Sequence, residues 1–343
     1  MDNREILAER RPTSRFSMDT EDQSNLCFPL LGNISCRKTT FDLAQRYIFI
    51  ALLPTTCILT VLLNLLVVIS ISHFRQLYTP TNLLLLSLAV SDILAVMGML
   101  AYLITNSTPC WFLGDIACSM INYLTFVCQS ASVGNMVLIS ADRFVAICDP
   151  LHYTVKVTVK RIQLCICLCW SASGIHCGIV LKDKLARPEI GNTCLGECVR
   201  SIDMIGGILD VSVNFFIPLG VIVILYTRVF VVAVSQARAM RSQAKCFKLQ
   251  NSAPVRAKKS ELKAAKTLGI VVLVFLLFFC PYNIASLMAF QMKVMNYIGY
   301  FYGLNACVNP LIYAVFYPSF RKAFKHIVTL RILQPGSCDA NIL

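Results

Sequence analysis

Seven long runs of apolar residues, separated by short segments rich in charge, dominate this chain of 343 residues. Within the runs only Asp92 and Asp210 carry a formal charge when histidine is counted as neutral. Each run has at least the roughly 20 residues that an α-helix needs to cross about 30 Å of hydrocarbon. The runs span residues 47–72, 81–105, 116–141, 162–181, 204–227, 267–292 and 294–320.

The pattern predicts an all-α membrane protein, built as a seven-transmembrane helix bundle. A segment inside lipid must satisfy its backbone polar groups internally, and runs of this length fit helices and not barrel strands. The composition agrees, because 57% of the residues are hydrophobic, 14% are charged and the mean hydropathy is +0.67. A soluble protein of this size has too little interior to cover so much apolar surface.

The formal net charge of +13 lies mainly in the gaps between the runs. Nucleic-acid binding would instead predict a basic face on a soluble domain, so membrane lipid and not nucleic acid is the expected partner. Lys and Arg crowd the segment between the fifth and sixth runs, which places that segment in the cytoplasm and the amino terminus outside. We expect an extracellular tail over 1–46 and a seven-helix membrane domain over 47–317. A short amphipathic eighth helix and a cytoplasmic tail are expected over 318–343.

Several motifs stand at fixed places in these runs, and their order is far more specific than any one of them. They are Asn64, Ser87-Leu88-Ala89-Val90-Ser91-Asp92, Asp142-Arg143-Phe144, Trp170, Pro218, Tyr226, Pro281 and Asn309-Pro310-Leu311-Ile312-Tyr313. The set resembles the rhodopsin-like G-protein-coupled receptors over almost the whole chain. A transporter would more often show internal repeats and interrupted helix pairs, and the sequence shows neither.

Two further stretches resemble one family of that superfamily, the trace amine-associated receptors. They are Lys263-Ala264-Ala265-Lys266-Thr267-Leu268-Gly269 and the segment from Asn309 through Lys322, although Ser319 stands where the family commonly has tryptophan. The resemblance implies a chemosensory (olfactory) receptor of the plasma membrane and not an enzyme. It also implies signalling to cyclic AMP through a heterotrimeric G protein of the stimulatory or olfactory type.

The resemblance further implies a switch for the G protein at the cytoplasmic ends of the helices. In the resting state Arg143 is expected to pair with Asp142, its neighbour in the chain. Glu261 of the sixth helix is expected to clamp the same arginine. Tyr226 and Tyr313 are expected to swing toward that space when the sixth helix opens.

Carboxylates at membrane depth are costly, so their default interpretation is functional. For Asp92 the resemblance implies a sodium site, because oxygen ligands suit a hard cation. The other ligands are expected to be Ser132, Asn305 and Asn309. The alternative is a buried hydrogen-bond network that contains no ion. No other cofactor is expected.

Asp210 is the second such carboxylate and the candidate ligand anchor. Amine receptors of this superfamily typically carry an aspartate eighteen residues before the arginine of the Asp-Arg motif, and that position is Thr125 here. Asp210 lies eight residues before Pro218, at a level where the fifth helix faces the cavity in this superfamily. The chain therefore resembles a fish-type branch of the family whose amine-binding aspartate is on the fifth helix.

A lone carboxylate in a low-dielectric cavity is penalised by desolvation, and a protonated amine relieves that penalty by pairing with it. We therefore expect a small amine as ligand, and a monoamine because the site has a single acid. The alternative is a non-amine ligand, with Asp210 in a structural hydrogen bond to Asn214. Helical spacing supplies the remaining cavity wall, namely Thr125, Phe126, Gln129, Ser130, Asn214, Tyr282 and Ser286.

Residues on the outer side predict covalent modifications. Asn33 begins a glycosylation sequon in the predicted extracellular tail. The resemblance implies two disulfides, Cys118–Cys198 and Cys36–Cys194, and disulfides persist in the oxidising exterior. Cys27 and Cys110 stay unassigned, a third bridge between them being one alternative.

Three positions inside the runs lack a clear assignment. His176 has no obvious partner in the sequence, which favours a neutral structural role. Gly303 and Phe279 stand where relatives usually carry tyrosine and tryptophan, so the shape of the cavity is expected to differ from theirs.

Overall fold

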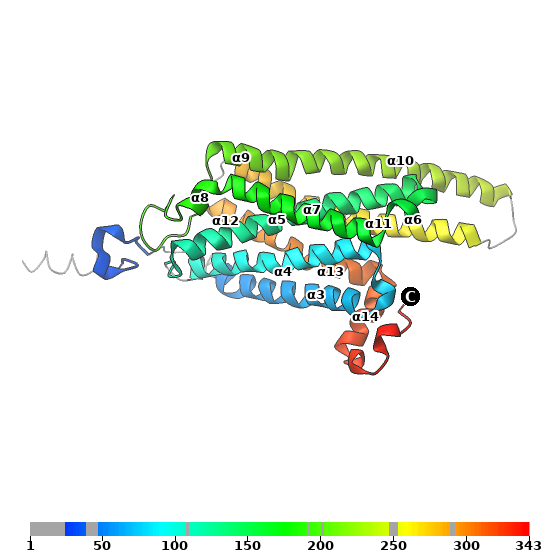
Figure 1. Ribbon diagram of the computed structural model, residues 1–343, viewed down its shortest axis with the longest axis horizontal. Helices are drawn as coiled ribbons and strands as arrows, with labels where there is room; N and C mark the ends of the chain where they lie inside the picture. The colour runs from blue at the N-terminus through cyan, green and yellow to red at the C-terminus, as the bar shows by residue number, and fades with distance from the viewer. Residues whose placement is uncertain are drawn as a thin grey trace, which may run out of the picture.

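The computed structural model of the chain is a bundle of long helices that run roughly parallel to one axis (Figure 1). It describes residues 25–38, 47–107, 110–190, 192–199, 202–246, 253–288 and 292–342. Two isolated bridges, Leu26 with Arg37 and Ser35 with Leu195, are the β-pairing in these residues. The described part of the chain is therefore helical, as predicted.

Each of the seven apolar runs contains a long helix or a chain of consecutive helices. The first comprises the π-helical turn η2 (Ile48–Leu52) and α3 (Leu53–His73), and the second to fourth are α4 (Pro80–Ser107), α5 (Gly114–Cys148) and α7 (Val159–Val180). The fifth comprises α9 (Met204–Val211), the π-helical turn η5 (Ser212–Phe216) and α10 (Ile217–Cys246). The sixth is α11 (Ala253–Leu287), and the seventh is divided into α12 (Met292–Gly303) and α13 (Asn305–Phe316).

Among the described residues, five helices are long and apolar enough to cross a membrane. These are Ile50–His73, Pro80–Ala101, Gly114–Cys148, Val159–Val180 and Met204–Val232. In the sixth helix the apolar part within the described residues is the shorter stretch Val272–Leu287.

Two of the predicted runs extend several residues past the ends of their helices. The sixth run was expected to reach residue 292, yet α11 ends at Leu287, because an apolar sequence alone does not mark where a helix stops. The seventh run was expected to reach residue 320, yet α13 ends at Phe316 and Tyr317 is extended. The next helix, α14 (Pro318–Val328), begins with the proline, which is well suited to a first helical turn.

The bundle has apolar side chains both inside and outside. Val67, Leu84, Met136 and Phe275 are fully buried in the main core. On α7, by contrast, one face of large apolar side chains is exposed, with Ile175 at 67% exposure. An apolar exterior of this kind is stable in lipid, because the lipid tails are as apolar as these side chains.

Small residues allow neighbouring helices of the bundle to approach closely. A Cβ added to Gly134 of α5 would lie 2.3 Å from the sulfur of Cys169 on α7. Nearby, the indole Nε1 of Trp170 donates a hydrogen bond of 3.0 Å to Ser87 Oγ on α4. Together these contacts fix α7 against α4 and α5.

The two ends of the bundle differ, and we name them the disulfide end and the α14 end. At the disulfide end lie the amino-terminal segment and α8 (Lys182–Ala186); at the other lie α14 and the carboxyl terminus (Figure 1). The carboxyl-terminal segment folds back there, because Ile342 is fully buried with Phe74, Leu77 and Ala323.

Candidate functional site

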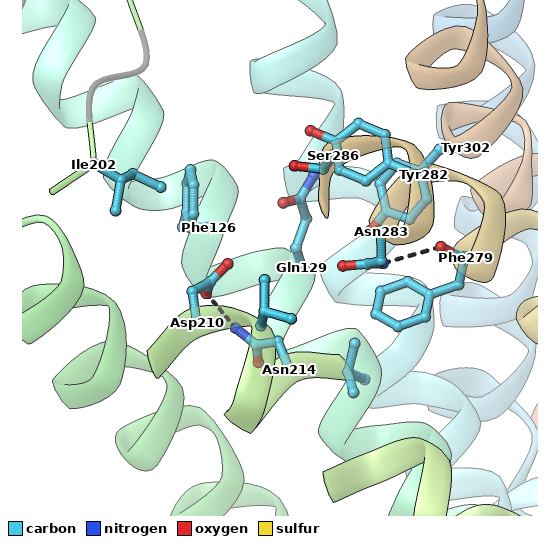
Figure 2. Close-up of a pocket in the computed structure, with 12 residues that line it drawn as sticks. Phe126, Gln129, Ile202, Asp210, Asn214, Phe279, Tyr282, Asn283, Ser286 and Tyr302 are labelled. Atoms are coloured by element: carbon cyan, nitrogen blue, oxygen red, sulfur yellow. Dashed lines mark hydrogen bonds between the residues drawn. The ribbon is translucent and has the colours of Figure 1, made fainter. Parts of the chain in front are cut away.

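A cavity lies between helices near the disulfide end of the bundle (Figure 2). Its wall combines aromatic rings with a few polar groups, which is the usual composition of a small-molecule site. The lining residues come from α5 (Phe126, Gln129, Val133), the segment before α9 (Ile202), α9 (Asp210, Val211), η5 (Asn214), α11 (Phe279, Tyr282, Asn283, Ser286) and α12 (Tyr302).

Asp210 is the acidic residue of this wall. Its Oδ1 accepts a hydrogen bond of 2.7 Å from the Asn214 amide, one turn further along the same helix. His176 of α7 brings its Nε2 to 3.4 Å from the same oxygen. Oδ2 takes part in no hydrogen bond within the described residues, and the side chain of Asp210 is 23% exposed. One oxygen is thus fixed to the protein and the other faces the cavity (Figure 2).

Stacked aromatic rings form the opposite part of the wall. The rings of Tyr282 and Tyr302 are 5.1 Å apart and nearly parallel. Phe279 stacks on Phe275 at 4.9 Å and lies 5.8 Å from Phe215. Figure 2 shows the rings of Phe279, Tyr282 and Tyr302 together on the side of the cavity that faces Asp210.

A second polar cluster lies deeper in the bundle, around Asp92 of α4. The Asn309 amide donates a hydrogen bond of 3.1 Å to Asp92 Oδ2, and Ser132 Oγ lies 2.8 Å from Ser91 Oγ. The side-chain oxygens of Asn305 and Asn309 are buried and, among the described residues, have no hydrogen-bond partner. Asn309 thus contacts Asp92 and keeps its own oxygen unpaired among the described residues, and carboxylate and carbonyl oxygens are ligands that suit a hard cation.

A third cluster lies toward the α14 end and is centred on Arg143. Its Nε donates a hydrogen bond of 2.9 Å to Asp142 Oδ2, and its guanidinium also contacts Thr81. Tyr153 donates to the other oxygen of Asp142 at 2.9 Å. Arg143 is therefore paired with Asp142, its neighbour in the chain.

The structure describes the side chains of only some of the other residues expected near Arg143. The hydroxyl of Tyr313 is buried and has no hydrogen-bond partner in the described part of the chain. The ring of Tyr226 packs against Gly269. Glu261 belongs to α11, but its side chain lies outside what the structure describes.

Three disulfides secure the loops at the disulfide end. They join Cys118 to Cys198, Cys36 to Cys194 and Cys27 to Cys110. The first two are the pairings that the resemblance implied, and the third realises the alternative left open for the two unassigned cysteines. Asn33 lies in the 3-10 helix η1 (Pro29–Ile34) of the same region, and its side chain is outside the described part.

Lys184 of α8 is buried beside these disulfides. Its Nζ donates hydrogen bonds to the Ile190 carbonyl at 2.8 Å and to Asn192 Oδ1 at 3.1 Å. Burial lowers the pKa of the Lys184 ammonium, and the nearby Asp115 opposes that effect. The Asn192 amide in turn donates to Asp115 at 2.7 Å, so the loop after α7 is tied to the start of α5.

Comparison with known proteins identifies the family. Residues 63–313 match the family described as 7 transmembrane receptor (rhodopsin family). The chain is 34% identical to trace amine-associated receptor 13c of Danio rerio over 333 residues, which cover 94% of this chain and 97% of that protein. It is 34% identical to trace amine-associated receptor 6 of Homo sapiens, with 92% and 95% covered. It is 33% identical to trace amine-associated receptor 1 of Mus musculus, with 93% and 99% covered.

The chain belongs to the trace amine-associated receptors. As a member of this family and of the rhodopsin-like superfamily, it is a multi-pass receptor of the plasma membrane and not an enzyme. Membership also implies a small-molecule ligand and a heterotrimeric G protein as its partners. The cavity at Asp210 and the cluster at Arg143 lie at opposite ends of the bundle, as those two partners require.

Most of the residues predicted to line the cavity of this trace amine-associated receptor do so, but two do not. Thr125 is 7% exposed and packs against α4, where a Cβ added to Gly98 would lie 2.4 Å from its Oγ1. Ser130 is equally buried and is absent from the wall. The physical reason is helical rotation. Phe126, Gln129 and Val133 follow the i, i+3, i+7 spacing of one helix face, and the two excluded residues flank that face on either side.

Sequence reasoning missed several residues of this site. Val133 lies four residues after Gln129 and Asn283 three residues before Ser286, so helical spacing from predicted members could have found both. Ile202 and Tyr302 come from other segments and gave no such signal. His176 is the most important omission, because the sequence offered it no partner and the structure gives it Asp210.

Proposed function

We propose that this receptor is chemosensory, binds a small protonated monoamine at Asp210, and signals through a stimulatory or olfactory G protein to cyclic AMP. The observation that supports it is Oδ2 of Asp210, which has no hydrogen-bond partner among the described residues and faces a cavity of aromatic, aliphatic and uncharged polar side chains. The names of the relatives, which refer to trace amines, agree with this ligand class.

Electrostatics favours an ammonium ion at this position. A carboxylate with one fixed and one unpaired oxygen in a low-dielectric cavity lacks part of the solvation that it has in water. An ammonium group supplies N–H donors and a compensating charge in the same contact. The aromatic side of the wall, including Tyr282 and Tyr302, would accommodate the apolar part of the ligand.

Signalling follows if the amine binds the active arrangement more tightly than the resting one. A ligand bound to Asp210 on α9 would pull directly on the fifth helix. The pull would act next to the π-helical turn η5, which contains Asn214. Opening of α11, which has Pro281 in its interior and so lacks one backbone hydrogen bond, would then expose Arg143. Freed from Asp142, that arginine would contact the G protein, with Glu261, Tyr226 and Tyr313 around it.

We assign a sodium ion to the cluster at Asp92, with Ser132, Asn305 and Asn309 as its other ligands. The side-chain oxygens of the two asparagines, which have no hydrogen-bond partner in the described part of the chain, support this assignment. When bound, the ion supplies the positive charge that a buried carboxylate otherwise lacks, and so favours the resting arrangement. The alternative is a hydrogen-bond network without an ion, of which the Asn309–Asp92 contact is one part.

The topology in the membrane belongs to the same proposal. The disulfide end faces the outside, with the tail of residues 1–46 extracellular and Asn33 glycosylated. Residues 318–343 are cytoplasmic. In α14, Phe320 and Ala323 are buried while Arg321 and Lys325 are exposed, which supports an amphipathic eighth helix at the inner membrane surface.

The substitution Asp210→Asn tests the amine site. It keeps the size of the side chain but removes the charge, so amine potency should fall by about 30-fold or more, the usual effect of breaking a desolvated ion pair. Cells expressing the parent and the variant would be compared by cyclic AMP responses to a panel of alkyl and aryl amines, at matched surface expression. Cys167→Ser, at an exposed free thiol, is the control and should respond as the parent does.

A receptor for a non-amine ligand is the second candidate, in which Asp210 is structural. The hydrogen bond from Asn214 and the contact with His176 favour it, because both could exist without any ligand. Normal amine potency in the Asp210→Asn receptor would establish this candidate and remove the first.

A further inference from the structure

His176 lies directly behind the amine anchor, on the side away from the cavity. It belongs to α7, its side chain is 11% exposed, and it is absent from the cavity wall. A histidine so far inside the helix bundle needs a hydrogen-bond partner. Its nearest polar groups belong to the fifth helix and are the carboxylate of Asp210 and the amide of Asn214.

The three side chains form a triangle around one oxygen atom. Asn214 Nδ2 is 2.7 Å from Asp210 Oδ1 and 3.3 Å from His176 Nε2, and His176 Nε2 is 3.4 Å from Asp210 Oδ1. When Nε2 of His176 carries the ring proton, it donates to the same oxygen as the Asn214 amide does. Two N–H groups then converge on Oδ1, and neither is directed at Oδ2. An N–H donor at this position orients Asp210 for a ligand, because it holds Oδ1 and leaves Oδ2 toward the cavity.

We propose that His176 is a positioning residue of the amine site, which fixes Asp210 through its Nε2–H. The inference rests on the proposed function, because it concerns the same carboxylate. It assigns the fourth helix a role in ligand affinity without a contact to the ligand.

Two substitutions separate a hydrogen-bonding role from simple packing. His176→Phe fills the same space without a donor, and amine potency should fall by about 10- to 100-fold, as expected for a lost hydrogen bond to a charged group. His176→Gln retains an N–H donor, and its potency should stay within about threefold of the parent. Ile175→Ala, at the adjacent lipid-facing residue, should match the parent. Cyclic AMP dose–response curves at matched surface expression provide the measurement.

Each outcome bears on a defined part of the proposal. If Asp210→Asn abolishes the amine response and His176→Phe responds like the parent, the inference fails and the proposed function stands. Equal weakness of the Phe and Gln variants would reduce His176 to a packing residue. If Asp210→Asn itself responds normally, the proposed function is the part that fails.

Discussion

The two oxygens of the Asp210 carboxylate have different surroundings. Oδ1 accepts from Asn214 and lies beside His176, while Oδ2 faces the cavity. A side chain fixed on one side loses little conformational freedom when a ligand binds on the other. At position 125 the same chemistry would fail, because that residue packs against Gly98 of α4.

The cluster at Asp92 gives a prediction at the residue scale. If sodium binds there in the resting state, replacing sodium with potassium should raise amine potency by about fivefold, which is a typical coupling between two sites. Asp92→Asn should lose this dependence, because the neutral amide no longer attracts a cation. The measurement is G-protein activation in isolated membranes with each salt at constant ionic strength.

The alternative network without an ion predicts a different result. The parent receptor would respond equally in both salts, since the contact between Asn309 and Asp92 needs no sodium. An equal sodium effect in the parent and the Asn variant would also contradict the assignment, because it would place the ion elsewhere.

At the scale of helices, close packing between α5 and α7 depends on residues with little or no side chain. Gly134 faces the sulfur of Cys169, and a Cβ at that glycine would lie 2.3 Å from it. A contact that short forces either the cysteine side chain or one of the helices to move, since the interior of the bundle is tightly packed. The position of His176 two turns further along α7 depends on the same packing.

Gly134→Ala should therefore destabilise the receptor by about 1–3 kcal/mol, the range for overpacked sites. Adding Cys169→Ala to the same chain should recover much of the lost stability, because it removes the sulfur atom that the new methyl group would contact. Melting temperatures of the detergent-purified receptors give the comparison. Gly178→Ala on α7 serves as control, because a Cβ there meets no atom within 4 Å. A melting temperature unchanged by Gly134→Ala would show that α5 and α7 accommodate the added methyl group without loss of stability.

At the scale of the whole molecule, the disulfide end is a cross-linked cap over the bundle. The bridge from Cys27 to Cys110 ties the amino-terminal segment to the turn before α5. Around it the Trp111 amide donates to the Gly196 carbonyl at 2.9 Å, and the rings of Phe28 and Phe112 pack edge to face. The segment is thus fixed at both the α4–α5 and the α7–α9 loops.

The double substitution Cys27→Ser with Cys110→Ser should lower the unfolding free energy by about 2–4 kcal/mol, because the bridge restricts the unfolded chain. The melting temperature should fall, while amine potency should change little, since neither residue lines the cavity. Cys167→Ser, at an exposed free cysteine, is the matched control. Equal melting temperatures of the double variant and the control would contradict a stabilising bridge.

The sequence by itself determined the membrane helices, the family and the position of the acid along the fifth helix. Hydropathy is a local property, so seven apolar runs are visible without any tertiary contact. Motifs such as Asp142-Arg143-Phe144 carry the family resemblance in their order alone. Counting from Pro218 located Asp210, because a helix rises by a constant amount per residue.

Only the tertiary structure decided which way the side chains point and which distant residues meet. Thr125 and Ser130 were predicted to face the cavity and do not, and His176 meets Asp210 across 34 residues of sequence. In a soluble protein the polar stripe of a helix marks its outer face. In a membrane the lipid side and the interior are both apolar, so the sequence does not encode helix rotation in the same way, and packing against neighbouring helices sets it.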